Sequence, residues 1–299
     1  MKMKLILLMF LASMAASAQV LFIQYPKPES SGDRRYADYY WSVLRLAMKK
    51  SRSKFGAYEI RESAVDMNER RAKKLIEMGG DGIDIMVHGN ISTWGASLNP
   101  VRFPLDKGVL GYRIFLLRKD TCEEMLARAN NNLKNYTIGQ GSGWEDIDIL
   151  RDAGYRVVDG GSYENLFKML SEGRFDLFSR GVNEIKKELD GNRGIHPNLT
   201  IEPRYAIYYP LARYFYVAKT KKGEEIKKRL LYGLNGINRD GSLDKLFNEV
   251  IIPTISDLHI GSREIFYIKN PFITERDNKI LNENLFRPAR EPVRKFQCE

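Results

Sequence analysis

Apolar positions in the first part of the chain switch between two spacings. Residues 20–24 form a short continuous apolar run that ends at Tyr25, as expected for a buried strand that leads into a loop. The next apolar positions recur at the three- and four-residue intervals of one helical face: Tyr40, Val43, Leu44, Ala47 and Met48. The pattern therefore predicts a strand followed by a helix.

The same alternation continues over the next forty residues. A strand is expected at 58–61, a helix at 68–78 that stops at Gly79, and a strand at 83–87. Strands that alternate with helices indicate parallel strands joined by right-handed crossovers, in which ligands bind just beyond the carboxyl ends of the strands. The segment from His88 to Asn90 is therefore a candidate rim.

A second α/β unit follows the first. It opens with a strand-like run at 109–118 and a helix at about 122–130. Further strands are expected at 136–139, 155–158 and 175–179, with helices at 145–153 and 163–171. Ser162 is a candidate N-cap for the last of these helices, and Gly173 its stop signal.

The C-terminal part adds a strand at 214–218, a helix at 224–237, a short helix from Ser242 and an irregular tail rich in Pro, Asn and Arg. No flexible spacer separates the two α/β units. We therefore expect an α/β fold of two lobes, each a mainly parallel sheet flanked by helices, joined by strands that cross between them and form a hinge.

The N-terminus has the pattern of a cleavable export signal. Lys2 and Lys4 precede an apolar stretch from Leu5 to about Met14, and small residues 15–18 follow, so cleavage is expected after Ala18. Position 19 is Gln rather than the Cys of a lipoprotein, which favours a free periplasmic protein. No later window holds about 20 uninterrupted apolar residues, so we expect no stable membrane insertion.

Composition narrows the partners only slightly. Without Lys2 and Lys4, 46 basic residues face 38 acidic residues, a net charge of +8 that suits anionic ligands or cell-envelope polymers. Nucleic acid is not expected, because the basic residues are scattered and no binding motif occurs. Cys122 and Cys298 could pair in an oxidising compartment, but their distance in space does not follow from sequence. No metal-ligand spacing is found, and no cofactor is expected.

Three segments resemble the extracellular solute-binding proteins of family 3, the amino-acid-binding branch of type II periplasmic binding proteins: 81–93 (DGIDIMVHGNIST), 138–150 (IGQGSGWEDIDIL) and 214–247. Segments 104–119 and 162–185 are closer still to a divergent, functionally unassigned branch. The resemblance implies a signal peptide at 1–18, a first lobe at 19–117, a second lobe at 118–213, and a return to the first lobe with a C-terminal tail at 214–299.

Departures from the family pattern bear on the ligand. The family commonly carries an Arg beyond the first-lobe rim, where residues 91–97 here contain none. It also commonly carries an Asp after the strand that corresponds to 175–179, where this chain has Ser179 and Arg180. A ligand ammonium group would then meet an arginine, which argues against an ordinary zwitterionic amino acid.

The turn before the helix at 145–153 is the first candidate site. Its sequence, Gly-Gln-Gly-Ser-Gly at 139–143, would present main-chain N–H groups near Gly141 and Ser142 to a carboxylate or phosphate. The glycine spacing fits neither the dinucleotide fingerprint nor a nucleophile elbow. A tight turn with an ordinary helix cap is the alternative.

Other candidates are single side chains with structural alternatives. Arg180 is either an anion clamp or the ion-pair partner of Glu184, and Asn183 lies on the same edge. Tyr25, Trp94 and Trp144 could stack on a ligand or pack in the core, and Asn90 and Ser92 belong to the first-lobe rim. The three histidines are interpreted as structural or surface residues: His88, His196 and His259.

The leading hypothesis is a monomeric periplasmic protein that closes its lobes over a small polar, anionic or carboxylate-bearing ligand. The resemblance implies delivery to an inner-membrane permease for ABC-type uptake. One alternative is a sensor or protein-interaction module with a degenerate pocket. Another is a dehydratase-like enzyme that uses Glu184 as acid or base; no paired catalytic constellation is present, so we expect no enzyme.

Overall fold

The computed structural model describes residues 20–28, 31–79, 82–89, 92–128, 132–292 and 294–298. For residues 31–37 and 92–94 it describes the backbone only. The expected signal segment at 1–18 and Asn90 therefore lie outside the described residues, as do the side chains of Ser92 and Trp94.

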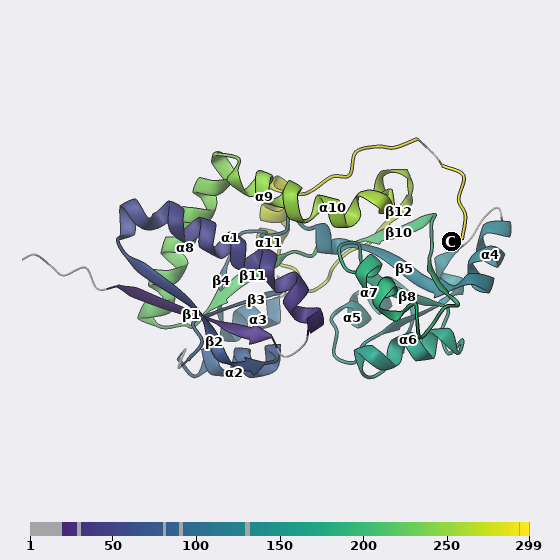
Figure 1. Cartoon of the computed structure of the whole chain (residues 1–299), viewed down its shortest axis with the longest axis horizontal. Coiled ribbons are helices and arrows are strands. Elements are labelled where there is room, and N and C mark those ends of the chain that lie inside the picture. The colour runs from purple at the N-terminus through teal and green to yellow at the C-terminus, as the bar shows by residue number, and fades with distance from the viewer. Residues whose placement is uncertain are drawn as a thin grey trace, which may run out of the picture.

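Two lobes lie side by side along the long axis of the molecule (Figure 1). The first lobe is built on strands β1 (Leu21–Pro28), β2 (Tyr58–Met67), β3 (Ile85–Gly89), β4 (Asn99–Val101) and β11 (Arg213–Val217). Strands β1 and β2 are parallel, and β11 runs antiparallel between β3 and β4. The helices of this lobe are α1 (Ser31–Phe55), α2 (Glu69–Glu77), α3 (Ser92–Ser97), α8 (Lys221–Arg239), α9 (Ser242–Val250) and α11 (Glu275–Glu283).

The second lobe is built on one seven-stranded sheet of order β12-β10-β5-β8-β6-β7, in which β9 also pairs with β5. Its strands are β5 (Tyr112–Arg118), β6 (Thr137–Gln140), β7 (Arg156–Asp159), β8 (Leu177–Gly181), β9 (Leu199–Ile201), β10 (Tyr205–Tyr208) and β12 (Glu264–Tyr267). Its helices are α4 (Lys119–Ala127), α5 (Asp146–Asp152), α6 (Tyr163–Ser171) and α7 (Ile185–Asn192). Short 3-10 turns occupy Val109–Gly111 and Leu133–Asn135.

Strand directions follow from the route of the chain. The strands of the β-α-β units are parallel, as the alternation predicts: β1 with β2, and β6 with β7 and β8. The strands that arrive from the other lobe, β5 and β11, run antiparallel to their neighbours, because each enters its sheet from the opposite end. The first lobe therefore holds a parallel pair, β1 and β2, and an antiparallel three-stranded sheet of order β3-β11-β4, whereas the second lobe holds one mixed sheet.

The C-terminal segment is more regular than the composition predicts. The irregular tail expected there contains α10 (Ile252–Ile255), two 3-10 turns at Ser256–Leu258 and Ile260–Ser262, strand β12 and helix α11. Strand β12 pairs in parallel with β10 and so joins the sheet of the second lobe. The expectation of an irregular tail is wrong here because a four-residue strand depends on a partner that is distant in sequence.

Local helix signals agree with the structure to different degrees. Helix α6 spans 163–171 as predicted, and Gly173 adopts a left-handed φ of 74° just beyond it. Ser162 occupies the N-cap position as predicted, although its side chain makes no capping hydrogen bond. A capping hydrogen bond does occur at helix α2, where the Asn68 side chain accepts from the Arg71 N–H at 3.0 Å.

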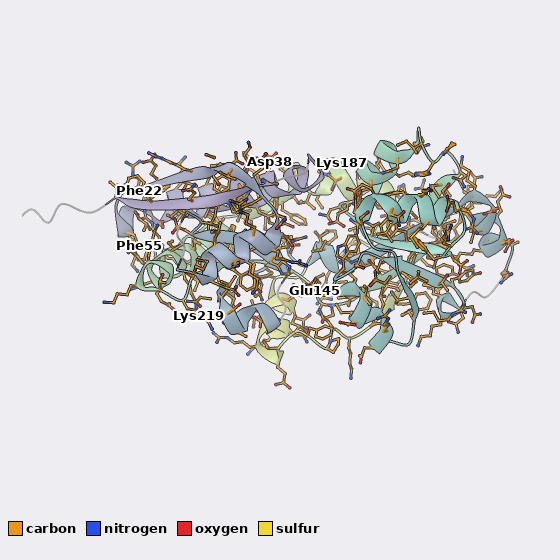
Figure 2. All side chains as sticks on the ribbon, turned by 90° about the horizontal axis from the view of Figure 1, so that it is seen from below. Phe22, Asp38, Phe55, Glu145, Lys187 and Lys219 are labelled. Carbon is orange, nitrogen blue, oxygen red and sulfur yellow. A yellow bond between two sulfur atoms is a disulfide. The ribbon has the colours of Figure 1, made fainter. Side chains whose placement is uncertain are left out.

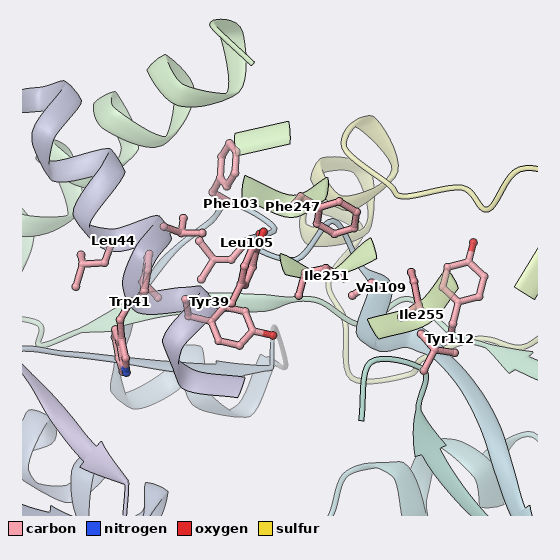
Figure 3. Packing of buried hydrophobic residues seen from close by; sticks show 14 of the residues in the cluster. Tyr39, Trp41, Leu44, Phe103, Leu105, Val109, Tyr112, Phe247, Ile251 and Ile255 are labelled. Atoms are coloured by element: carbon pink, nitrogen blue, oxygen red, sulfur yellow. The ribbon is translucent and has the colours of Figure 1, made fainter. Parts of the chain in front are cut away.

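The main apolar core is continuous between the lobes (Figure 3). Trp41 and Leu44 of α1 belong to the same buried cluster as Ile251 beyond α9 and Tyr112 of β5. Burying apolar area contributes about 25 cal/mol per Å², so this shared core favours one arrangement of the lobes. The lobes are therefore not packed as independent units.

A disulfide joins Cys122 in α4 to Cys298, with 6.0 Å between their Cα atoms and a sequence separation of 176 residues. This resolves the pairing that the sequence left open. Among the helices described, none is long and apolar enough to cross a membrane.

Candidate ligand-binding site

Charged side chains from both lobes meet where the carboxyl ends of β3 and β6 approach each other. Figure 2 shows Glu145, which follows β6, on the side of the second lobe that faces the first. His88 lies in β3, and its Nε2 is 3.7 Å from Glu145 Oε1. This contact joins the two lobes directly, so the predicted rim at His88 does lie at the junction.

His88 also contacts a carboxylate of its own lobe. Its Nε2 is 3.6 Å from Oε2 of Glu69, the first residue of α2. Burial lowers the pKa of His88 to about 4, so the imidazole is neutral at pH 7. The Glu69 and Glu145 side chains remain 58% and 36% exposed, respectively, so these two carboxylates of opposite lobes are accessible beside an uncharged histidine.

Arg180 is engaged by carboxylates of its own lobe. Its Nε and Nη2 donate to the two carboxylate oxygens of Glu188 at 2.6 Å each, and Nη2 lies 3.1 Å from Glu184. Burial opposes its charge, but Glu188 and Glu184 raise the pKa of Arg180 above its ordinary value. Its guanidinium also stacks over the Trp144 ring at 4.8 Å. The ion-pair interpretation of Arg180 thus has direct contacts, with Glu188 as the main partner.

Arg113 is a second buried arginine, and sequence reasoning missed it. Its Nε donates to the Tyr209 hydroxyl at 2.8 Å, and its Nη2 lies 2.8 Å from Asp146 and its Nη1 3.8 Å from Glu184. Burial works against ionisation of Glu184, but Arg180 and Arg113 together hold the pKa of Glu184 below its ordinary value. The only sequence signal for Arg113 is a charge inside the otherwise uncharged run at 109–117.

Arg213, the first residue of β11, completes the cluster from the first lobe. Its Nη1 lies 3.5 Å from Glu69, and its N–H donates to Asp106 at 3.2 Å. The contacts among these groups involve three arginines and a larger set of carboxylates: Glu69, Glu145, Asp146, Glu184 and Glu188. The cluster therefore carries more negative than positive charge.

The glycine-rich turn at 139–143 is closed by its own backbone. The Ser142 N–H donates to the Gly161 carbonyl at 3.1 Å, and its hydroxyl donates to Asp159. A Cβ on Gly141 would lie 2.6 Å from the Trp144 ring, which explains the glycine there. Helix α5 begins later, at Asp146, with acidic residues in its first turn. These features favour the tight-turn alternative over anion binding by main-chain amides.

Three buried polar atoms near the ends of β6 and β8 have no hydrogen-bond partner within the described part of the chain: Gln140 Oε1, Ser179 Oγ and Asn183 Oδ1. Gln140 and Ser179 are neighbours, since Gln140 Nε2 donates to the Ser179 carbonyl at 3.4 Å. Leaving such a group unpaired costs about 1–3 kcal/mol, so these atoms are suited to donors supplied by a ligand or water. Asn183 is a predicted site residue; Gln140 and Ser179 were not singled out.

The aromatic candidates fall into different settings. Tyr25 stacks on Trp41 with ring centroids 4.4 Å apart and accepts a hydrogen bond from Arg45 at 3.4 Å, which is a packing role in the first lobe. Trp144 is half-buried between Arg180 and Phe178, its ring centroid 6.4 Å from that of Phe178. The residues described contain no group of three or more His, Cys, Asp or Glu side chains that could hold a metal ion.

Comparisons with known proteins agree on the architecture. No family model and no curated protein matches the chain. Among solved structures, the BvgS VFT2 domain of Bordetella pertussis is 16% identical over 77% of this chain and 92% of that one, with a TM-score of 0.52. An arginine-specific periplasmic binding protein of Salmonella typhimurium is 14% identical over 78% of this chain and 100% of that one, with a TM-score of 0.49.

A histidine kinase sensor domain with similarity to periplasmic binding proteins is 13% identical over 78% of this chain and 96% of that one, with a TM-score of 0.49. Identities this low show the fold alone. The chain has a two-lobed α/β fold, as the sequence predicts, and it shares this fold with the BvgS VFT2 domain.

Proposed function

We propose that this chain is an exported, monomeric binding protein that holds a small polar solute between its two lobes. The observation that carries the proposal is the contact of His88 in the first lobe with Glu145 in the second, beside partly exposed Glu69. A solute that touches both carboxylates interacts with the two lobes only when they are together. Such a difference in affinity is what shifts a two-state equilibrium toward closure.

The charge balance favours a solute that carries a protonated amine or guanidinium group. The sequence pattern predicts an anionic ligand held by Arg180 or by the amides near Ser142. Arg180 is instead bound by Glu188, and the Ser142 amide by Gly161. The accessible groups are carboxylates, and the unpaired amide oxygens of Gln140 and Asn183 would accept further hydrogen bonds from the solute.

A thermal-shift panel tests the ligand class. We expect 1,4-diaminobutane, methylguanidine or arginine to raise the melting temperature, because a ligand that binds only the folded state stabilises it. Succinate, phosphate and glucose serve as comparison solutes of similar size. A rise in melting temperature with succinate or phosphate alone would contradict the proposed amine or guanidinium ligand. The proposal that the chain binds a small solute between its lobes would still stand.

Substitution of the two carboxylates then tests the site. A Glu69→Gln/Glu145→Gln variant should weaken binding of the active amine at least tenfold, about 1.4 kcal/mol, in calorimetric titration. Asp148→Asn is the matched control, because Asp148 is an exposed carboxylate one turn along α5. Equal affinity in the double variant and the control would contradict the proposed site.

A sensor or protein-interaction module is the second candidate. It is favoured by the observation that the protein's own ion pairs, Arg180 with Glu188 and Arg113 with Asp146, occupy the lobe edge where a ligand is expected. The absence of any shift across the panel would favour this function. Delivery to a permease becomes testable by transport assay once a solute is known.

The dehydratase alternative receives less support. Arg180 and Arg113 keep the pKa of Glu184 low, so its carboxyl is ionised near neutral pH and cannot donate a proton. A role as a base is disfavoured as well, because the Glu184 carboxylate is already bound by Arg180 and by the Gly181 N–H, which donates to it at 3.2 Å. These contacts favour a structural role for Glu184.

A further inference from the structure

The C-terminal quarter of the chain passes repeatedly between the lobes. Segments 102–111 and 209–212 connect the two lobes, and the chain crosses again at 251–263, 268–274 and 284–291. Figure 1 shows the last of these passages, in yellow, running from the first lobe across to α4 of the second. Segments 102–111 and 209–212 would be enough to form a hinge, so the three later crossings are additional connections between the lobes.

The last passage begins from a firmly held helix. Leu281 of α11 is fully buried in the cluster that contains Tyr214 and Tyr216 of β11. Asp277 of the same helix accepts from Arg102 Nε at 3.1 Å. Helix α11 therefore belongs to the first lobe and fixes one end of the segment that follows. We term its described residues, 284–292 and 294–298, the C-terminal strap.

The strap is held at the hinge and then along the crossing segment 251–263. The Phe286 N–H donates to the Lys107 carbonyl at 2.8 Å, and the Phe286 carbonyl accepts from the Tyr112 hydroxyl at 3.3 Å. Farther on, the Glu291 N–H donates to the Gly261 carbonyl at 3.2 Å, and the Glu291 carboxylate lies 2.8 Å from His259 Nδ1.

Close backbone approach and a covalent bond complete the attachment. A Cβ on Gly261 would lie 1.7 Å from the Ala289 carbonyl oxygen, so only glycine permits the strap to lie there. Cys298 then bonds to Cys122, which is fully buried in the core of the second lobe. The first lobe is thus tied through α11 and the strap to a covalent anchor in the second.

We propose that the C-terminal strap is a disulfide-fastened tether that limits how far the two lobes separate. Opening about the hinge moves α11 away from α4, and the strap has to detach from Lys107, Tyr112 and Gly261 before it lengthens. The continuous core across the lobes acts in the same direction. This inference concerns the ligand-free protein and does not depend on the identity of a solute.

The test severs the strap in the folded, oxidised protein. A protease recognition sequence inserted after Lys295 allows cleavage without loss of the disulfide or the core, and the uncut protein is the matched control. A Cys122→Ser/Cys298→Ser variant releases the same end without cleavage. Small-angle X-ray scattering then reports the radius of gyration, and hydrogen exchange reports the Phe286 and Glu291 amides.

We expect cleavage to increase the radius of gyration and to speed exchange of the Phe286 and Glu291 amides at least tenfold, with the same changes in the double-serine variant. If that variant does not fold, the cleaved protein decides alone. An unchanged radius of gyration after complete cleavage would overturn the proposal, even with faster amide exchange, because the strap would then be released without any separation of the lobes.

Discussion

At the scale of single residues, the junction depends on pairing of buried charges. Arg180 and Glu188 are both buried and form two parallel hydrogen bonds. The sequence indicates a helix-spaced pair of Arg180 with Glu184, which does occur at 3.1 Å, but it does not indicate Glu188. The second partner depends on how α7 folds back against β8, and α7 carries too weak a pattern to be predicted.

Breaking this pair should be costly. Arg180→Met leaves Glu188 as a buried charge with its main partner removed, and we expect a loss of about 3–5 kcal/mol in the free energy of unfolding by urea. Arg180→Met/Glu188→Leu should lose much less, because neither charge is then buried alone. Lys168→Met in the exposed Lys168–Glu172 pair is the control, with an expected change below about 1 kcal/mol. Additive costs of the single substitutions would show that the two residues are not coupled.

His88 should make stability depend on pH. Its pKa is about 4 in the folded protein and about 6.5 when unfolded, so the unfolded state takes up a proton first as pH falls. The contribution of His88 to the free energy of unfolding is therefore fully present above pH 6.5 and is lost as pH falls from 6.5 to about 4. Its upper limit is about 3 kcal/mol.

Two other buried groups act in the opposite direction. Burial raises the pKa of Asp106 to about 6 and that of Glu202 to about 7, so their contributions are lost as pH rises. A His88→Gln variant retains both. The difference in unfolding free energy between wild type and variant should therefore fall from pH 7 to pH 4, and a difference that stays constant with pH would contradict the assignment.

At the scale of elements, the strongest patterns were predictable. Helix α6 matches its predicted span, and most strands and helices of the β-α-β units lie within a few residues of their predicted positions. Strand β2 is longer than predicted, since it runs to Met67 rather than to 61, and α1 begins at Ser31, well before the apolar pattern that predicts it. The strands that were missed are short and rely on distant partners, such as β10, which pairs with β5 and β12. Strand β10 lies between β12 and β5 in the sheet, so its position depends on residues far away along the chain.

Helix packing provides a prediction at this scale. Gly233 of α8 lies against α1, where an added Cβ would be 2.0 Å from the Ala47 carbonyl oxygen. Gly233→Ala should push the two helices apart and cost about 1–3 kcal/mol in thermal or urea unfolding. Gly191→Ala in α7, where a Cβ meets open space, should be neutral or stabilising by up to about 1 kcal/mol. Equal effects of the two substitutions would contradict the packing argument.

At the scale of the whole molecule, the lobes share one core and one covalent tie. The largest apolar cluster includes residues of both lobes, and the Cys122–Cys298 bond closes a span of 176 residues. Both features oppose separate unfolding of the lobes. Any movement of the lobes around a solute therefore has to occur with the shared core and the disulfide in place.

Reduction of the disulfide should lower stability by about 2–4 kcal/mol, because the bond restricts the unfolded chain. Urea unfolding with and without reductant measures the difference. The Cys122→Ser/Cys298→Ser variant should match the reduced protein and should not respond to reductant. A stability that does not change on reduction would indicate that the tie contributes nothing beyond the core.

The sequence by itself determined the α/β alternation, the division into two units and the positions of the main helices and strands, because these follow from local periodicity and turn residues. Only the tertiary structure decided that Glu145 meets His88, that Arg113 and Glu188 belong to the junction, and that Cys298 reaches Cys122. Those contacts join residues far apart along the chain, and no local pattern specifies which distant side chain will complete a buried charge or a disulfide.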